Sequence, residues 1–167
     1  MGAYWLDADV LIQAKNSYYS FVLAKQMWDF LEAQGKCGTV RSSMKVYGEI
    51  LSYEDHGEEL VKWCKARKTS GLFSPAEKDV QEIYGEIADH VVQRYPERPA
   101  KVGEFLKGAD GWIIAHAKRD HGIVVTHESR RNVTAKVPKV PNVCHAFDVG
   151  CIDLPSMLTA LKFRFGK

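Results

Sequence analysis

Acidic residues stand at points of the chain where a folded sheet could bring them together. The candidate catalytic residues are Asp7, Glu49, Asp110 and Glu128, and Asp9 is a further candidate metal ligand. Asp7 directly follows the short apolar segment 3–6, and Glu128 lies just beyond the β-branched segment 123–126. Ligands of open parallel sheets bind outside the carboxyl ends of the strands. We therefore expect these acids to converge at one edge of a sheet.

Converging carboxylates repel one another and raise one another's pKa values unless a cation lies between them. Mg²⁺ and Mn²⁺ prefer oxygen ligands, and two such ions about 4 Å apart can activate water and stabilise a leaving oxygen in phosphodiester cleavage. The pattern thus favours metal-assisted phosphoryl chemistry, with Mg²⁺ or Mn²⁺ as the cofactor. A structural interpretation fits the residues alone about equally well, because Asp7 and Asp110 could instead cap helices.

Basic residues could bind the phosphates of such a substrate. Arg130, Arg131, Lys136 and Lys139 follow Glu128 closely, and clustered cations can hold phosphate. A solvated basic loop explains this cluster equally well. The predicted phosphate contacts are Arg41, Lys45, Arg130 and Arg131.

Strand and helix patterns alternate along the chain, which predicts an α/β fold with a mostly parallel sheet. Strands are expected over 3–6, 37–40, 123–126 and 143–147, with a short edge segment over 71–73. Helices are expected over 9–15, 20–35, 57–67, 75–94, 108–118 and 154–163.

Capping signals refine these expectations. Ser42 or Ser43 should cap a further helix that carries Glu49. Ser74 should cap the helix that starts at Pro75, since proline is favoured at the first helical position. The mostly helical region 57–98 could form an arm laid over the sheet.

Composition indicates a soluble globular protein with a single domain over residues 1–167. The chain is 46% hydrophobic and 26% charged, which indicates neither disorder nor a fibrous repeat. No apolar run approaches the roughly 20 residues of a membrane-spanning helix, and the first residues do not resemble a secretory signal. The four cysteines form no CxxC pair, so we expect reduced, mostly buried thiols in a cytoplasmic protein.

Motifs of several other enzyme classes are absent from the sequence. The six histidines form no HExxH motif, and no GxSxG elbow surrounds Ser42 or Ser43. No GK[ST] follows Gly108 and Gly111, so a phosphate-binding loop is excluded. Trp112 could stack on a base at the mouth of the site, although its apolar helix face favours core packing.

Four short segments resemble, in their order, the motifs of PIN domains. Segment 4–12 (YWLDADVLI) resembles their opening strand, which ends in Asp-x-Asn or Asp-x-Ser, and segment 46–50 (VYGEI) resembles the helix that carries their second acid. Segment 108–117 (GADGWIIAHA) is similar to their third motif, an Asp before an alanine-rich helix, and segment 124–128 (VVTHE) to a strand that ends in Thr-x-Asp. Segment 139–144 is similar to a PIN-like branch among bacterial and archaeal toxin-type proteins.

This resemblance implies a Rossmann-like three-layer α/β/α sandwich and Mg²⁺- or Mn²⁺-dependent RNA cleavage. It also implies the toxin of a toxin–antitoxin pair, with an antitoxin protein as partner, and a homodimer. Thr126 would orient the acids through its hydroxyl group at the substrate site. Two residues depart from the family pattern: Asp9 stands where Asn or Ser is usual, and Glu128, with a longer side chain, stands where Asp is usual.

The leading hypothesis is therefore an endoribonuclease. One alternative is a non-catalytic RNA- or partner-binding module of the same fold, in which Asp9 and Glu128 would be signs of drift. Another is a DNA-directed or structure-specific nuclease on this scaffold. Metal binding separates the first alternative from the leading hypothesis, and a comparison of RNA and DNA cleavage rates separates the second.

Overall fold

A parallel sheet lies at the centre of the molecule. The computed structural model describes residues 2–52, 58–128 and 134–166, and within them five strands form the sheet in the order β3-β2-β1-β4-β5. The strands are β1 (Tyr4–Leu6), β2 (Val40–Ser43), β3 (Phe73–Ser74), β4 (Ile123–Val125) and β5 (Gly150–Ile152). All four neighbouring pairs are parallel. The carboxyl ends of all strands therefore meet at one edge, as the sequence predicted.

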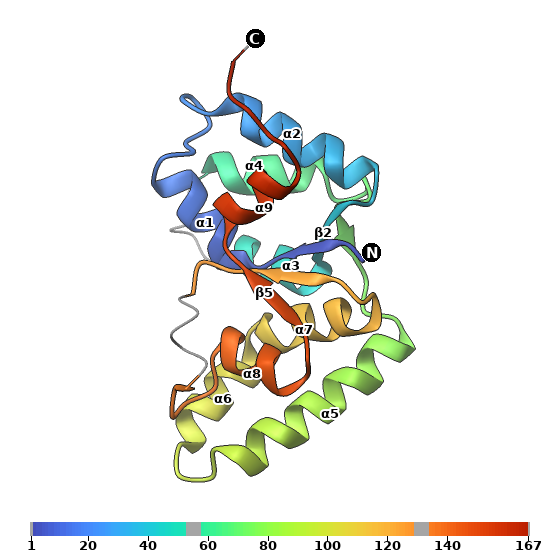
Figure 1. Ribbon diagram of the computed structural model, residues 1–167, viewed down its shortest axis with the longest axis vertical. Coiled ribbons are helices and arrows are strands. Elements are labelled where there is room, and N and C mark those ends of the chain that lie inside the picture. The colour runs from blue at the N-terminus through green and yellow to red at the C-terminus, as the bar shows by residue number, and fades with distance from the viewer. Residues whose placement is uncertain (1, 53–57, 129–133, 167) are drawn as a thin grey trace.

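Helices cover both faces of this sheet. They are α1 (Ala8–Asn16), α2 (Lys25–Lys36), α3 (Met44–Ser52), α4 (Glu58–Ala66), α5 (Lys78–Arg94), α6 (Pro99–Lys107), α7 (Asp110–Arg119), α8 (Val140–Ala146) and α9 (Leu154–Ala160). Figure 1 shows α1, α2, α4 and α9 on one side of the sheet and α5, α6, α7 and α8 on the other. The fold is an α/β/α sandwich of the Rossmann-like type, which confirms the predicted fold class.

The core forms where apolar strands meet small-residue helix faces. Trp5, Leu6 and Val124 are completely buried because both faces of a parallel sheet are covered. On α7, which contacts β1, β2 and β4, Ile113 and Ala115 are also completely buried. A strand at 3–6, a strand at 123–126 and a helix at 108–118 were predicted, and all three are confirmed with bounds that differ by a few residues.

A buried histidine lies in this core. His116 of α7 has no exposed surface, stacks on Trp5 with ring centroids 4.5 Å apart, and has no hydrogen-bond partner for either ring nitrogen. Burial lowers the pKa of His116 to about 4, so this side chain is neutral at physiological pH. Among the other groups, Cys64 and Cys144 are buried thiols, as predicted, whereas Cys37 is exposed.

Two predicted elements begin later in the structure. The strand expected over 37–40 is β2, which extends to Ser43, and Ser43 then caps α3 by accepting the Lys45 backbone N–H at 3.1 Å. The helix expected over 20–35 begins only at Lys25. Its expected first turn was wrong because Ser20 accepts the Leu23 N–H at 3.2 Å, and such local side-chain bonds compete with helix formation.

Ser74 does not cap the next helix. It lies in β3, where it pairs with Ser43 of β2, and α5 begins at Lys78. Strand pairing therefore outweighs the local capping signal. The predicted arm over 57–98 is also divided: α4 lies on one side of the sheet, and α5 packs along α7 on the other (Figure 1).

The strand expected over 143–147 was wrong, and this segment is helix α8. Lys139 donates its backbone N–H to the Asn142 side chain at 2.8 Å, and Pro141 lies in the first turn, where proline is favoured. The last strand is β5, which comes after the tight turn at Asp148. Asp153 then caps α9 by accepting the Ser156 N–H at 2.8 Å, which confirms the predicted closing helix.

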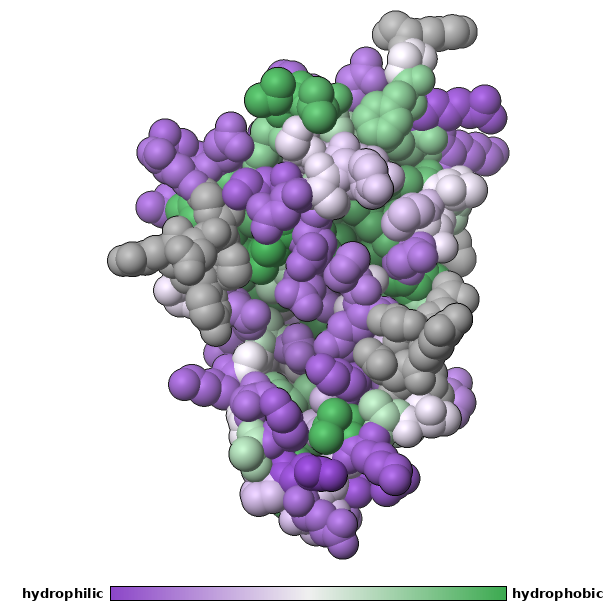
Figure 2. Space-filling model, turned by 90° about the vertical axis from the view of Figure 1, so that its left-hand side faces the viewer, coloured by the Kyte–Doolittle hydropathy of each residue, from purple (hydrophilic) through white to green (hydrophobic). Residues whose placement is uncertain are grey.

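The outer surface is largely hydrophilic on one side. Figure 2 views the side of the molecule on which α6 lies in Figure 1, and hydrophilic side chains cover much of the middle and lower part of that side. Within the described parts of the chain, no helix has the length and apolar character needed to cross a membrane.

Candidate functional site

Asp7 lies at the carboxyl end of the central strand and is almost completely buried. Its Oδ1 accepts the Asp9 backbone N–H at 2.6 Å and thereby caps α1, while its Oδ2 accepts the Thr126 hydroxyl hydrogen at 2.7 Å. Thr126 stands at the end of β4, the neighbouring strand. Thr126 therefore contacts Asp7 directly, in agreement with the predicted role of its hydroxyl group in orienting the acids. Asp7 is both the cap of α1 and an acidic group held at the carboxyl edge of the sheet.

Burial also sets the protonation of Asp7. Loss of hydration raises the pKa of this carboxyl group from 3.8 to about 7, and the negative charges of Asp9 and Glu128 add to the rise. The hydrogen bonds from Thr126 and from the Asp9 backbone act in the opposite direction. Because desolvation is the largest cause, the cost of burying its negative charge is the main reason why Asp7 holds its proton up to a pKa of about 7.

Asp110 is the meeting point of the acidic residues. It opens α7, and burial raises its pKa well above the usual value. The charges of Asp7, Glu128, Glu49 and Asp9 raise it further, in that order. The other four acids singled out from the sequence therefore all act on Asp110, although they come from distant parts of the chain.

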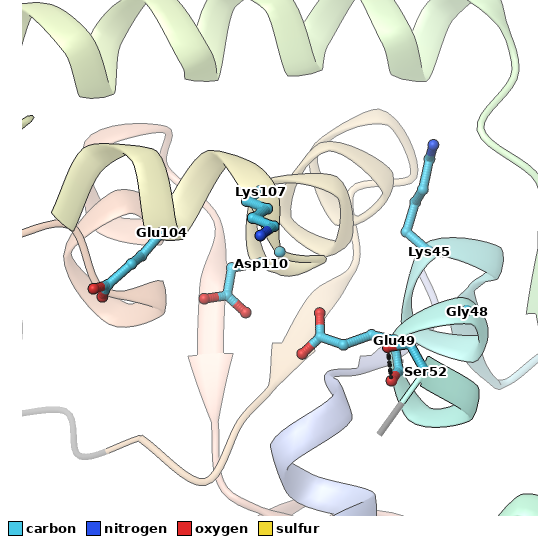
Figure 3. A pocket seen from close by; sticks show the side chains of 8 residues that line it. Lys45, Gly48, Glu49, Ser52, Glu104, Lys107 and Asp110 are labelled. Carbon is cyan, nitrogen blue, oxygen red and sulfur yellow. Dashed lines mark hydrogen bonds between the residues drawn. The ribbon is translucent and has the colours of Figure 1, made fainter. Parts of the chain in front are cut away.

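Glu49 reaches the site from α3. Its Oε2 accepts the Ala109 backbone N–H at 2.8 Å, so this carboxylate supplies the cap that α7 lacks from its own N-terminal residue. Figure 3 shows the carboxyl groups of Glu49 and Asp110 pointing toward the same space between α3 and the start of α7. The bond holds the Glu49 side chain beside the start of α7.

This space is a cavity of about 690 Å³ that is open to solvent. It is lined by Lys45, Gly48, Glu49, Ser52, Glu104, Lys107, Gly108 and Asp110. The lining cations are Lys45 and Lys107. Figure 3 shows Lys107 beside Asp110, whereas the Lys45 ammonium group and the Glu104 carboxylate point away from the acidic pair. Lys107 was missed in the sequence, although it stands immediately before the Gly108–Asp110 segment that was singled out.

A second, smaller cavity adjoins Asp110 on its other side. It has a volume of about 160 Å³ and is lined by Lys101, Glu104, Phe105, Asp110, Glu128, Val137, Pro138 and Lys139. Glu104 and Asp110 line both cavities. Asp110 is therefore approached from two sides, and each side contributes lysine residues.

Glu128 is near the other acids but is engaged elsewhere. Its Oε2 accepts the Val140 backbone N–H at 2.8 Å at the start of α8, and its Oε1 lies 3.9 Å from Lys139 Nζ. Burial raises the pKa of Glu128, while the Val140 bond and Lys139 lower it. The Glu128 side chain thus connects the start of α8 to the site.

The donor set suits a hard divalent cation. It consists of carboxylate oxygens, the ligands that Mg²⁺ and Mn²⁺ prefer. The pKa values of Asp7 and Asp110 are raised first by burial and then by the neighbouring negative charges. Among the residues that the structure describes, no three His, Cys, Asp or Glu side chains are already arranged to hold a metal ion. Asp7, Glu49 and Asp110 could provide ligands after side-chain rotation, with Asp9 at the exposed rim.

The predicted phosphate contacts are placed differently from one another. Lys45 lines the large cavity. Arg41 does not, because its guanidinium group donates to the Gly38 carbonyl at 3.4 Å and to the Ser74 hydroxyl at 3.3 Å. Arg130 and Arg131 lie outside the described residues.

Trp112 packs between two neighbours. Its ring stacks on Tyr84 with centroids 3.8 Å apart and an angle of 4° between the planes, and Lys45 Nζ lies 4.7 Å from the Trp112 ring centroid. Tyr84 in turn donates its hydroxyl hydrogen to the Leu106 carbonyl at 2.9 Å. This packing agrees with the core interpretation of Trp112 and places the Lys45 ammonium group over an aromatic ring at the cavity wall.

Comparison with known proteins identifies a family. The family described as "Domain of unknown function (DUF4411)" matches residues 4–165. This match covers nearly the whole chain and includes every acid described above. Curated proteins gave no match.

Proposed function

The chain belongs to the DUF4411 family, and we propose that it is a Mg²⁺- or Mn²⁺-dependent ribonuclease similar to PIN domains. The observation that carries this proposal is the clustering of Asp7, Glu49 and Asp110 at the carboxyl edge of the sheet, with raised pKa values for the two aspartates. In open α/β sheets this edge is where ligands bind. A buried acidic group of this kind is a candidate functional site because burying like charges is costly.

Hydrogen bonds hold two of the three acidic side chains in position. Asp7 is oriented by Thr126 and by the Asp9 backbone, and Glu49 by the Ala109 backbone. These bonds keep the two carboxylates close to Asp110, so that rotation of the side chains would bring their oxygens around a cation. When bound, Mg²⁺ or Mn²⁺ supplies Lewis-acid activation of water and of the phosphodiester group.

The lysines of the cavity would hold the substrate. Lys45 and Lys107 line the same cavity as Glu49 and Asp110, so a phosphate group there meets positive charge beside the acids. The packing of Lys45 on Trp112 limits where its ammonium group can go. The role in substrate binding predicted for Lys45 is thus part of the proposal, and Lys107 joins it, whereas Arg41 does not.

RNA cleavage tests the proposal directly. We expect purified protein to cleave single-stranded RNA in Mg²⁺ or Mn²⁺ but not in EDTA, and Asp110→Asn to lower the rate by at least about 100-fold, since general electrostatic and metal-dependent contributions are of this size. The matched control is Asp89→Asn, which removes an exposed carboxylate from α5. Equal cleavage by wild type and Asp110→Asn would show that the site is not catalytic, and faster cleavage of matched DNA would change the substrate class.

A non-catalytic RNA-binding module is the second candidate. The contacts of Glu128 favour it: one carboxylate oxygen accepts the Val140 N–H and the other lies near Lys139. Glu128, one of the four acids that resemble the PIN-domain motifs, would have to give up these contacts to bind a metal. Calorimetric titration with Mn²⁺ separates the candidates, because a binding module needs no ion at Asp110. The toxin role, the antitoxin partner and the homodimer are predictions that rest on the resemblance alone.

A further inference from the structure

A second charged region lies beyond the acidic site, at the connection between α5 and α6. A cavity of about 550 Å³ is lined by Arg94, Tyr95, Pro96, Glu97, Arg98, Thr134, Ala135 and Lys136. Three of these residues are exposed cations, and only Glu97 is acidic. Within the described part of the chain, Arg94, Arg98 and Lys136 take part in no ion pair, and the Arg94 guanidinium lies 5.6 Å from the Tyr95 ring centroid.

The two chain segments that line this cavity lead directly into segments that line the small cavity beside Asp110. One wall runs from the 94–98 connection to Lys101 on α6, and the other from Thr134–Lys136 to Lys139. The cations along these walls are Arg94, Arg98, Lys136, Lys101 and Lys139. Lys101 Nζ lies 3.0 Å from the Glu104 carboxylate and Lys139 Nζ 3.9 Å from that of Glu128, so these two lysines are paired with acids that line the small cavity. Figure 2 shows hydrophilic side chains extending over this side of the molecule toward the end at which α5 and α6 lie.

The wall that carries Lys136 and Lys139 is held in place from beneath. The buried side chain of Asn142 donates to the Ala135 carbonyl at 3.2 Å and to the Val137 carbonyl at 2.8 Å, and it accepts the Lys139 N–H at 2.8 Å. These three bonds fix the backbone of the segment, so its lysines project from a defined position. A loosely held basic loop would lack such an anchor.

We propose that this row of cations, from Lys101 and Lys139 to Arg94, Arg98 and Lys136, binds the phosphate backbone of RNA at several nucleotides from the acidic centre. The inference rests on the proposed function for its ligand, RNA. A row of separated cations matches a chain of regularly spaced phosphates, because each contact releases bound counterions from the strand. It would make an RNA of many nucleotides a better substrate than a dinucleotide.

The test replaces the three distal cations at once by Arg94→Gln, Arg98→Gln and Lys136→Gln. The matched control removes three exposed cations from other regions, by Lys65→Gln, Lys118→Gln and Arg164→Gln. Binding of a fluorescent 12-nucleotide RNA is measured in EDTA by anisotropy at several salt concentrations. We expect the triple variant to bind at least about 10-fold more weakly at low salt, with a slope of log Kd against log salt smaller by about 2, whereas the control keeps the wild-type slope.

Two further outcomes are decisive. Polyglutamate and unlabelled RNA are compared as competitors at equal charge concentration. If polyglutamate displaces the fluorescent RNA with the same efficiency as unlabelled RNA, the ligand is an acidic protein and the proposal is overturned. Equal RNA affinity of the triple variant and the control would also overturn it. Binding is measured without metal, so the two proposals can fail separately. A wild type that cleaves no RNA but binds it through the three cations would disprove the ribonuclease and support this inference. A wild type that cleaves RNA, with unchanged RNA binding in the triple variant, would support the ribonuclease and disprove this inference.

Discussion

Asp7 stabilises its surroundings through hydrogen bonds, but the burial of its charge costs free energy. As the cap of α1 and the partner of Thr126 it organises the carboxyl end of β1, yet burial disfavours its charged form. Natural proteins keep such costly groups mainly where function requires them. The same reasoning applies to Asp110, which has four acidic neighbours.

The cost of the Asp7 charge predicts how stability depends on pH in EDTA. The folded pKa is about 7 and the usual value is 3.8, so between these values the folded state keeps a proton that the unfolded state loses. The contribution of Asp7 to folding stability therefore declines as pH rises from about 4 to about 7 and is constant above. Asp7→Asn removes this dependence while its side-chain oxygen can still cap α1.

We therefore expect Asp7→Asn to gain stability over wild type across this pH range, by on the order of 3 kcal/mol between pH 4 and pH 8. Urea unfolding of both proteins at pH 4.5, 6 and 8 measures the difference. The neutral, buried His116 also affects the pH profile, but it is present in both proteins and cancels in the difference. A difference that does not change with pH would contradict the buried charge of Asp7.

At the scale of elements, the connection between β4 and α8 joins the acidic site to the basic row. Glu128 bonds the start of α8, and Asn142 on α8 holds the backbone from Ala135 to Lys139. The helix therefore positions both an acid near Asp110 and the wall that carries the lysines.

Removing this anchor should loosen the wall. We expect Asn142→Ala to lower the free energy of unfolding by about 1–3 kcal/mol, because it leaves partly buried backbone groups without their side-chain partner. We also expect it to weaken RNA binding. Thr159→Ala is the control, since the Thr159 hydroxyl makes only a local bond on α9, to the Pro155 carbonyl, and should change stability by less than about 0.5 kcal/mol. Urea unfolding and RNA anisotropy report the two effects, and unchanged RNA affinity in a destabilised Asn142→Ala would separate the wall from binding.

Much of the site was predictable because its acids stand at points that topology fixes. Asp7 follows a buried strand and Asp110 opens a helix, and the parallel sheet then brings them to one edge. Lys107 and Asn142 were not predicted, since their roles depend on which loops face each other after folding. The segment 143–147 was assigned to a strand because the apolar pattern of a short helix does not differ from that of a strand, and the anchoring by Asn142 decides the outcome.

At the scale of the whole molecule, the acidic centre and the basic row give the surface a polar division that a net charge of +2 conceals. The acids lie at the carboxyl edge of the sheet, and the cations extend from there toward the α5–α6 end. A divalent cation would balance the first region and the phosphate backbone the second. Under the two proposals the ligands would be coupled, because a cation at Asp110 would lower the repulsion that an incoming phosphate meets.

This division predicts that the stability gained from metal depends on pH. At pH 8, above its pKa of about 7, Asp7 is largely ionised. Mn²⁺ at a hundredfold excess over its Kd should then stabilise the fold by about 2.7 kcal/mol, which raises Tm by about 5–10 °C for a chain of this size. At pH 5.5 the proton held by Asp7 competes with the ion, so the rise in Tm should be much smaller. Thermal unfolding with and without Mn²⁺ at both pH values measures this. The rise in Tm at pH 8 should remain in the control Asp89→Asn and should be lost in Asp110→Asn. A rise that remains in Asp110→Asn would show that Mn²⁺ binds at another group, because the exposed histidines could also hold this ion at pH 8.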